Sequence, residues 1–331
     1  MKELDNFDLR LLACLEEDAR QTLSHMAKKL RSSQQVISYR IQSLEKRGII
    51  GGYYTIIDIE KLGYTSYRTL IQLSNINEQK HKQIIEYLRN HPNVLWLVDC
   101  GGKWDLLVNF MAKNIVQYSA LLREFKGTFP EQIQNYDVLT IVQVIYLGRD
   151  YFTRRQRDIK KIVGFGGKWI EPTRLDKNNL QILSSLSENG RMSAVEIAEK
   201  MKISPNTVIL RIKEMKKSGV LQGFKPLIHL ENTPYHTYKA LIKFHNLIEE
   251  REEEILKYVQ TDVRIGGAIK LIGLWDFEIE FEVKNKEEML EITRNFREVF
   301  KDVIKEFEIL PLFHEYRYNF FPRDLLNQKN I

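Results

Sequence analysis

A polar surface without acidic groups is the part of this 331-residue chain best suited to chemistry. At about 100° per residue, a helix over residues 34–46 would place amides, hydroxyls and one ammonium on a single face. The outward residues are Gln35, Ser38, Tyr39, Gln42, Ser43 and Lys46, and the apolar residues opposite them are Val36, Ile37, Ile41 and Leu44. Amides and hydroxyls can bond base edges and lysine can contact a phosphate, so the pattern indicates a helix that lies against DNA.

Both ends of this helix are marked in the sequence. Ser33 can cap the N-terminus by accepting from backbone N–H groups two and three residues on, and Gly48 stands where a left-handed residue commonly ends a helix. The candidate DNA contacts here are Ser33, Gln34, Gln35, Ser38, Tyr39, Arg40, Gln42, Ser43 and Lys46. Most polar helix faces are simply solvated, so the flanking elements must decide between the two interpretations.

The flanking sequence has the order of a winged helix-turn-helix. Leucines recur at helical spacing over residues 9–15, and Thr22 can cap a short helix over residues 23–30. After Gly48, residues 49–54 change to a strand-like run that contains two glycines. Helix, short helix, polar helix and strand is the winged order, which favours DNA binding over the alternative of a small helical packing module.

The whole pattern occurs twice at one offset of 171 residues. Leu4-Asp5 falls on Leu175-Asp176, Gly48 on Gly219, and Trp104-Asp105 on Trp275-Asp276. The offset holds without a gap from the first helix to Phe129 and Phe300. The chain is therefore a tandem duplication.

The second copy predicts the same helix boundaries from different residues. Ser193 and Glu196 form a capping box, and Ser204-Pro205 supplies an N-cap followed by proline at the first helical position. Its candidate DNA contacts are Asn206, Arg211 and Lys213. However, Ile209, Leu210 and Glu214 replace Ser38, Tyr39 and Ser43, which predicts a weaker DNA-reading head or a packing surface.

Each copy continues with an α+β module. Strands are expected over residues 66–74, 94–100, 104–111 and 133–147, with helices over 78–90 and 114–126, and the order returns over 237–318. The order βαββαβ predicts a ferredoxin-like domain with both helices on one face of its sheet. The other face needs a cover, and the second copy would supply it as an intrachain pseudo-dimer.

These patterns predict six segments. They are a winged helix-turn-helix at 1–52, a ferredoxin-like sensor domain at 53–148, a basic linker at 149–174, a second winged helix-turn-helix at 175–223, a second sensor domain at 224–321 and a tail at 322–331. Gly164 to Lys168 resembles a phosphate loop only briefly, because its spacing is wrong and Trp169 follows where Ser or Thr is required.

Composition places the chain among folded proteins with a mild preference for polyanions. It has 43% hydrophobic and 28% charged residues, a net charge of +6 and a pI near 9.0. No signal peptide and no membrane-spanning run is recognisable, so a cytoplasmic location without a membrane partner is expected. The two cysteines cannot form a disulfide framework, and the seven scattered histidines show no metal-ligand spacing, so no metal site is predicted.

The combined motifs resemble the Lrp/AsnC, or feast/famine, family of transcription regulators. The resemblance is carried by Leu4-Asp5, Leu9, Leu12 and Arg20, by Ser33 to Gly51, and by the turn Gly102-x-Trp104-Asp105-Leu106, and it covers both copies. It implies a DNA-binding regulator in fused-dimer form, with sensor (RAM) domains that bind an amino-acid-like effector at an interface and with further homo-oligomerisation possible.

The residues that match the family's effector region are Gly101, Gly102, Asp105, Gly273 and Asp276. The alternative is purely structural, with glycines forming the turn and aspartates capping backbone groups. Trp104 and Trp275 are bulky for a turn that lines an amino-acid pocket, which weighs against a typical effector site.

Two other functions share this architecture. Sirohaem decarboxylases are also fused Lrp-like halves, but residues 96–100 and 267–271 lack the histidine and arginine that the resemblance would require. A sensor or adaptor without DNA binding would have lost the polar face in both heads, and only the second head shows that tendency. The sequence therefore predicts a regulator with no catalytic residues and no cofactor.

Overall fold

The computed structural model describes residues 4–153 and 163–327, and it contains two copies of one α+β arrangement. The first copy comprises α1 (Asn6–Glu17), α2 (Leu23–Leu30), α3 (Gln34–Lys46), β1 (Ile50–Ile57), η1 (Glu60–Leu62), β2 (Thr65–Leu73), α4 (Glu78–Asn90), β3 (Val94–Cys100), β4 (Leu106–Ala112), α5 (Ile115–Thr128) and β5 (Ile133–Tyr146). Then come η2 (Asp150–Phe152) and β6 (Val163–Gly166). The second copy comprises α6 (Lys177–Glu188), α7 (Ala194–Met201), α8 (Pro205–Lys217), β7 (Leu221–Ile228), η4 (Leu230–Asn232), β8 (His236–Phe244), α9 (Glu249–Thr261), β9 (Ile265–Ile272), β10 (Phe277–Val283), α10 (Lys286–Val299) and β11 (Ile304–Tyr318), before η5 (Arg323–Asn327). The predicted α+β class, with a helix-turn-helix and a βαββαβ module in each copy, is confirmed.

Side-chain caps fix the helices of the two heads, which we call head 1 (α1–α3) and head 2 (α6–α8). Ser33 accepts from the N–H of Val36 at 3.2 Å, and the capping box of Ser193 with Glu196 is formed. Gly48 and Gly219 follow α3 and α8 with φ of 67° and 72°, a conformation that costs glycine little. The sequence therefore sets both ends of each polar helix.

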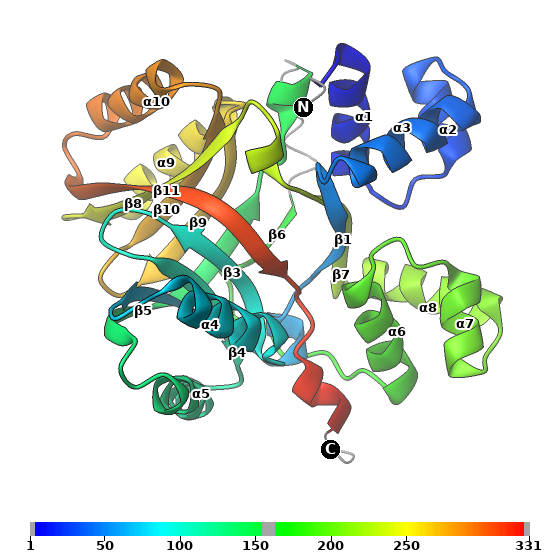
Figure 1. The fold of residues 1–331 in the computed structure, drawn as a ribbon, viewed down its shortest axis with the longest axis horizontal. Coiled ribbons are helices and arrows are strands. Elements are labelled where there is room, and N and C mark those ends of the chain that lie inside the picture. The colour runs from blue at the N-terminus through cyan, green and yellow to red at the C-terminus, as the bar shows by residue number, and fades with distance from the viewer. Residues whose placement is uncertain (1–3, 154–162, 328–331) are drawn as a thin grey trace.

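A two-stranded ribbon joins the heads. The strands that follow α3 and α8, β1 and β7, pair antiparallel with each other rather than within their own heads (Figure 1). Each head also contacts the ribbon strand of the other copy. The backbone N–H of Ala19 donates to the carbonyl oxygen of Phe224 in β7, and that of Gly190 donates to the carbonyl oxygen of Tyr53 in β1. Arg20 of head 1 donates to the carbonyl oxygens of Gly190 and Met192 in head 2, at 2.9 and 2.6 Å. The ribbon thus holds the two heads against one another.

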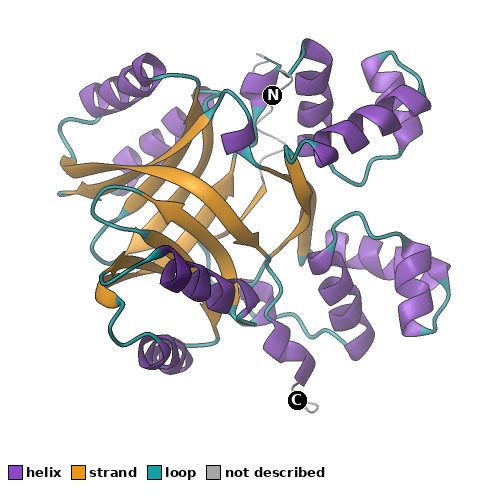
Figure 2. Ribbon diagram, viewed as in Figure 1, coloured by secondary structure: helices purple, strands orange, loops and turns teal. Residues whose placement is uncertain are grey.

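The two sensor modules close into one ring of eight strands. Their order is β2-β4-β3-β11-β8-β10-β9-β5, and β5 pairs back onto β2. The copies meet twice, through β3 with β11 and through β5 with β9. Helices α4, α5, α9 and α10 lie outside the barrel, as Figure 2 shows, and the strands enclose the interior. The cover predicted for each sheet is therefore the sheet of the other copy.

The segment predicted as a basic linker, residues 149–174, contains regular structure. Strand β6 pairs with β5, and Tyr151 and Phe152 are buried in the core of head 1. The basic residues at 154–162 lie outside the described residues. The boundaries expected at 52/53 and 223/224 fall inside β1 and β7, because these strands pair across the copies and leave no break there.

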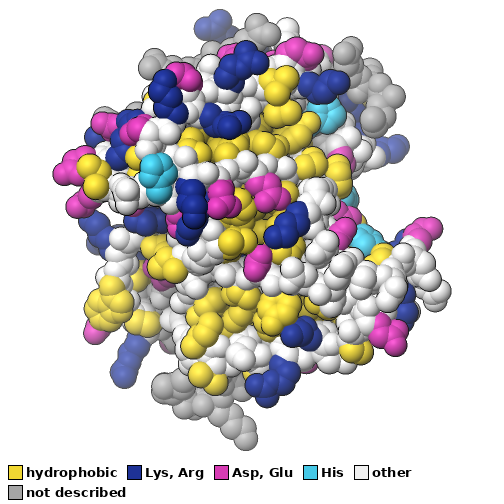
Figure 3. All heavy atoms as spheres, turned by 90° about the vertical axis from the view of Figure 1, so that its left-hand side faces the viewer, with side chains coloured by type: hydrophobic (Ala, Val, Ile, Leu, Met, Phe, Trp, Pro, Cys, Tyr) yellow, Lys and Arg dark blue, Asp and Glu magenta, His cyan; other side chains and the backbone are white. Residues whose placement is uncertain are grey.

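Among the described helices, none is both long and apolar enough to cross a membrane. On the barrel face turned away from the heads, hydrophobic side chains lie among the charged ones (Figure 3). Val116 and Ile272 are among the exposed apolar residues of the sensor modules, at 75% and 65% of their full area.

Candidate DNA interface and interior cavity

The polar face predicted for α3 is on the surface. Tyr39 is 69% exposed, and Gln34, Gln35, Gln42 and Lys46 are exposed as well. Ser38 and Ser43 are half-buried, while Ile37, Ile41 and Leu44 are buried in the core of head 1. Val36, expected on the buried side, is 42% exposed. The face presents amides, hydroxyls and an ammonium, as a helix that reads DNA requires.

Two of the residues predicted to contact DNA form ion pairs within their own heads. Arg40 pairs with Asp5 at 2.7 Å and with Asp8 at 3.1 Å, and Arg211 pairs with Asp176 at 2.7 Å. Burial alone would raise the pKa of Asp5, but the backbone N–H of Asp8 and the Arg40 guanidinium hold that pKa below its usual value. These arginines attach the polar helix to the first helix of its head.

Head 2 presents a more apolar face. Asn206 and Lys213 are exposed as predicted, but Ile209 and Leu210 between them are each 55% exposed. Aliphatic side chains can contact a thymine methyl and cannot bond a phosphate. The two heads are therefore chemically unequal.

The turn residues assigned to an effector region make structural contacts. The Asp105 carboxylate accepts the N–H of Leu73 at 2.7 Å, and the Asp276 carboxylate accepts that of Phe244 at 2.9 Å. Gly273 has φ of 145°, and a Cβ there would lie 2.9 Å from the carbonyl oxygen of Val138. The remaining glycines of the set, Gly101 and Gly102, lie in the β3–β4 turn.

None of these five residues borders the interior cavity. Trp104 and Trp275 were expected to be bulky at a turn that lines an effector pocket. They are buried in the main core at 1% and 5% exposure, because the turn folds the indoles inward.

A cavity of about 420 Å³ lies inside the barrel, between the two sensor modules. Among the described residues that line it are six glutamates and four basic residues, namely Glu16, Glu231, Glu278, Glu280, Glu282 and Glu315 with Arg68, Arg149, Lys225 and Lys239. Tyr54, Tyr146, Tyr318, Trp96 and Phe165 supply aromatic walls. A partly enclosed cavity that gathers polar groups between aromatic walls is a candidate small-molecule site.

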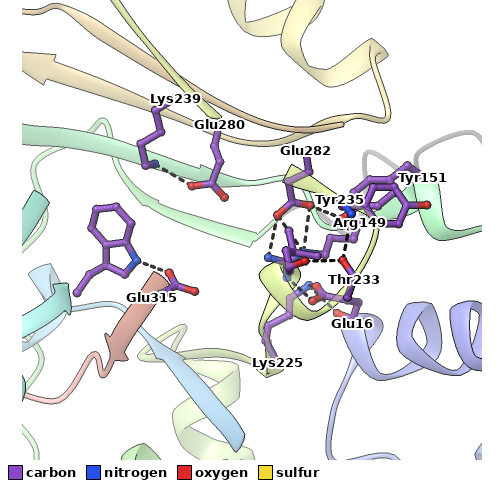
Figure 4. A network of polar contacts seen from close by, with 12 residues as sticks. Glu16, Arg149, Tyr151, Lys225, Thr233, Tyr235, Lys239, Glu280, Glu282 and Glu315 are labelled. Carbon is purple, nitrogen blue, oxygen red and sulfur yellow. Dashed lines mark hydrogen bonds and ion pairs between the residues drawn. The ribbon is translucent and has the colours of Figure 1, made fainter. Parts of the chain in front are cut away.

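One ion cluster in this wall is centred on Arg149 (Figure 4). Its guanidinium lies 2.7 Å from Glu16 of α1 and 2.9 Å from Glu282 of β10, and Tyr151 donates to Glu282 at 2.6 Å. Lys225 of β7 also reaches Glu16. The cluster thus joins head 1, the ribbon and the barrel.

Nothing in the repeat indicated this cluster. At the offset of 171, the positions of Arg149, Glu16, Glu282 and Lys225 are taken by Phe320, Ser187, Met111 and Tyr54. Those residues form apolar packing or short polar contacts instead. Related positions in the two copies have diverged in polarity.

A second group of charges crosses the cavity. Glu278 pairs with both Arg68 and Lys239, and Lys239 also lies 2.8 Å from Glu280. Glu315 accepts the indole N–H of Trp96. Burial and the nearby Glu280 raise the pKa of Glu315 to about 7.

A third group was also missed, because its members are far apart in sequence. His229, Glu231 and His314 come together where η4 meets β11. No local spacing connects residue 231 with residue 314, so the sequence could not indicate the cluster.

Two tandem helix-turn-helix heads on a closed α+β barrel define a winged helix-turn-helix DNA-binding protein. Family models agree, because residues 4–45 match an AsnC-type helix-turn-helix domain and residues 175–222 match a winged helix-turn-helix DNA-binding domain. An uncharacterised HTH-type transcriptional regulator of Pyrococcus horikoshii is 31% identical over 151 residues, which cover 44% of this chain and 96% of that protein. The transcriptional regulatory protein DoeX of Halomonas elongata is 32% identical over 37% of this chain and 78% of its own length. The chain belongs to the Lrp/AsnC family of DNA-binding transcription regulators, in a tandem form.

The whole architecture also occurs in an enzyme. The crystal structure of the siroheme decarboxylase NirDL aligns with a TM-score of 0.58 over 95% of this chain and 93% of that one, at 14% sequence identity. At this identity the likeness concerns the fold alone.

Proposed function

We propose that this regulator reads a specific DNA sequence chiefly through α3 of head 1, with α8 of head 2 as a weaker second reader. The observation that carries the proposal is the exposed polar face of α3, whose one carboxylate, Glu45, accepts a hydrogen bond from the Tyr53 hydroxyl at 2.7 Å. In this proposal the contacts of head 1 are Ser33, Gln34, Gln35, Ser38, Tyr39, Gln42, Ser43 and Lys46, and those of head 2 are Asn206 and Lys213. Arg40 and Arg211 act by orienting their helices.

A single chain then forms the pseudo-dimer that presents both heads. The paired ribbon and the closed barrel support this proposal, because each would otherwise need a second polypeptide. The exposed apolar side chains on the far face of the barrel support further assembly of whole chains (Figure 3).

The effector is proposed to bind in the interior cavity. Glutamates outnumber basic residues there, and the Ser66 hydroxyl is buried without a hydrogen-bond partner among the described residues. Glu280 and Glu315 suit an ammonium group, while Arg68, which already pairs with Glu278, would share its guanidinium with a bound carboxylate. A small zwitterion of the amino-acid type matches both.

The chain is proposed to lack decarboxylase activity despite the shared fold. The proposal is supported by residues 96–100 and 267–271, which lack the histidine and arginine that the resemblance to sirohaem decarboxylases would require. Anaerobic incubation with sirohaem followed by mass analysis tests this proposal, and decarboxylated product at repeated turnover would contradict it.

Selection of bound sequences from a random duplex pool tests the main proposal. We expect one enriched motif, and Gln35→Ala with Gln42→Ala should reduce its enrichment far more than Asn206→Ala with Lys213→Ala in head 2. An unenriched pool, or equal losses from both pairs, would contradict the assignment of α3 as the main reader.

A further inference from the structure

Three side chains that commonly bind metals meet at the junction of head 1 and the barrel. Nδ1 of His314 lies 2.6 Å from Oε1 of Glu231, and Nδ1 of His229 lies 3.4 Å from the same oxygen. One ligand atom from each of the three lies within 4.8 Å of the others, and the two imidazole rings are parallel at 5.5 Å. Nδ1 of His229 is buried and makes no hydrogen bond among the described residues.

These distances are close to those of a metal site. Around a tetrahedral ion with bonds near 2.0–2.1 Å, ligand atoms lie roughly 3.3 Å apart. The three atoms therefore need only small side-chain rotations to reach one ion. The side chain of His314 is 45% exposed and that of Glu231 is 32% exposed, so an ion and its water ligands can reach them from solvent.

The first copy lacks this site, and its equivalent position is covered. At the offset of 171, His229, Glu231 and His314 correspond to Asp58, Glu60 and Gln143. Strand β6 pairs with β5 from Gln143 onward. In the second copy, residues 314–318 of β11 pair with β3 on one side, and no described strand pairs with them on the other. His314 thus lies on a strand edge that, among the described residues, is not covered as β6 covers the matching edge of β5.

The cluster is connected to the end of the reading helix. The backbone N–H of His229 donates to the carbonyl oxygen of Ile49 at 2.9 Å, and the Asn232 amide donates to that of Gly48 at 2.9 Å. Gly48 follows Arg47, the C-cap residue of α3. His314 belongs to the barrel, so a bond between the two sides would tie α3 to the sensor modules.

We infer that His229, Glu231 and His314 bind one divalent transition-metal ion, which couples the metal to the position of head 1. Two imidazoles and one carboxylate suit Zn²⁺, Co²⁺ or Fe²⁺ and leave coordination positions for water. Mg²⁺ and Ca²⁺ prefer all-oxygen sites, so they serve as negative controls. The effect on DNA rests on the proposed function, whereas binding of the ion does not.

Titration of untagged full-length protein with Co²⁺ under anaerobic conditions tests the site. We expect one equivalent to bind with visible absorption bands of a nitrogen- and oxygen-ligated ion, and Zn²⁺ to displace it. His314→Ala and Glu231→Gln should each weaken binding at least tenfold, while Gln143→Ala, at the matching position of the first copy, should leave it unchanged. Thermal unfolding without metal checks that each variant folds.

Two results would overturn the site. They are the absence of stoichiometric Co²⁺ binding by the parent protein, and binding by both ligand variants at parental affinity. Mg²⁺ displacing Co²⁺ at equal concentration would contradict the assigned metal class.

A gel-shift titration on the selected DNA, with and without Zn²⁺, tests the coupling. We expect Zn²⁺ to change the affinity of the parent at least threefold and that of His314→Ala not at all. An unchanged affinity of the metal-loaded parent would refute the coupling alone. A parent that binds no DNA with or without Zn²⁺ would refute the proposed function, and the Co²⁺ titration would still decide the metal site.

Discussion

At the scale of single residues, the interior of the barrel holds charges that ordinary packing would exclude. Glu315 accepts one hydrogen bond, from the indole N–H of Trp96, and the Glu280 carboxylate lies near it. Burying a carboxylate without a full partner favours its protonated form. This environment raises the pKa of Glu315 from its ordinary value of 4.5 to about 7.

Glu315→Gln should therefore stabilise the protein at pH 8 by roughly 1–3 kcal/mol. The folded state holds the Glu315 proton more tightly than the unfolded state does, so parental stability should fall as the pH rises from about 4.5 to 7. The variant should lack that part of the decline. Urea unfolding at pH 5 and pH 8 measures both effects.

Glu306→Gln on the same strand is the control, because Glu306 is exposed. A Glu315→Gln protein that is no more stable than the parent at pH 8 would mean that Glu315 is adequately solvated in the cavity.

Substitutions on α3 should distinguish the residues that set sequence preference from those that contribute affinity for any DNA sequence. Each good base contact contributes about 1–3 kcal/mol of discrimination, so Gln35→Ala with Gln42→Ala should relax the preferred sequence. Lys46→Ala should weaken binding to all sequences and reduce the salt slope by about one unit. Gel-shift titrations at several salt concentrations measure both, and parental behaviour of both variants would exclude α3 as the reader.

At the scale of elements, head 1 is joined to the barrel by an ion network in addition to apolar packing, while head 2 packs on apolar residues of the main core. Arg149 connects Glu16 of α1 with Glu282 of β10, whereas its counterpart Phe320 lies in the main core with residues of head 2. Buried ion networks depend on every member, because loss of one leaves another charge uncompensated.

Arg149→Met should lower the free energy of unfolding by about 3–5 kcal/mol. It leaves Glu282 and Glu16 facing each other without the guanidinium that neutralises them. Arg149→Lys, which keeps the charge but not the two-sided geometry, should cost less. Chemical denaturation compares the three proteins, and a loss below about 1 kcal/mol for Arg149→Met would show that water replaces the network.

Local signals predicted the elements well, because they lie within a few residues of what they determine. The helix predicted over 78–90 and the strand over 94–100 agree with α4 and β3, and the caps at Ser33 and Ser193 are formed. The pairing of β1 with β7 could not be predicted, since a strand following a helix-turn-helix usually implies its own wing. The Arg149 and His314 clusters join residues more than 80 positions apart, and no periodicity reports such distances.

At the scale of the whole molecule, one chain carries two unequal heads on a ribbon and a barrel that both copies build. Both the ribbon and the barrel are closed by pairs between the copies. Contacts within one polypeptide do not weaken on dilution as those between subunits do.

The preferred DNA site should therefore be asymmetric. We expect one well-specified half and one degenerate half, spaced by about 10 base pairs or a multiple. Footprinting at nanomolar protein measures this arrangement. Equal protection of a strict palindrome would mean that the heads are equivalent or that two chains cooperate.

Because the ring of strands includes both copies, the barrel can close only after the second copy has been synthesised. The first copy leaves the ribosome with one edge of β3 and part of one edge of β5 unpaired, because their partners β11 and β9 belong to the second copy. At typical rates of about 5–20 residues per second, β9 follows β5 by roughly 6–25 s. During that interval a neighbouring nascent chain offers the same strands, so crowded polysomes should yield strand-exchanged dimers that dilute refolding avoids.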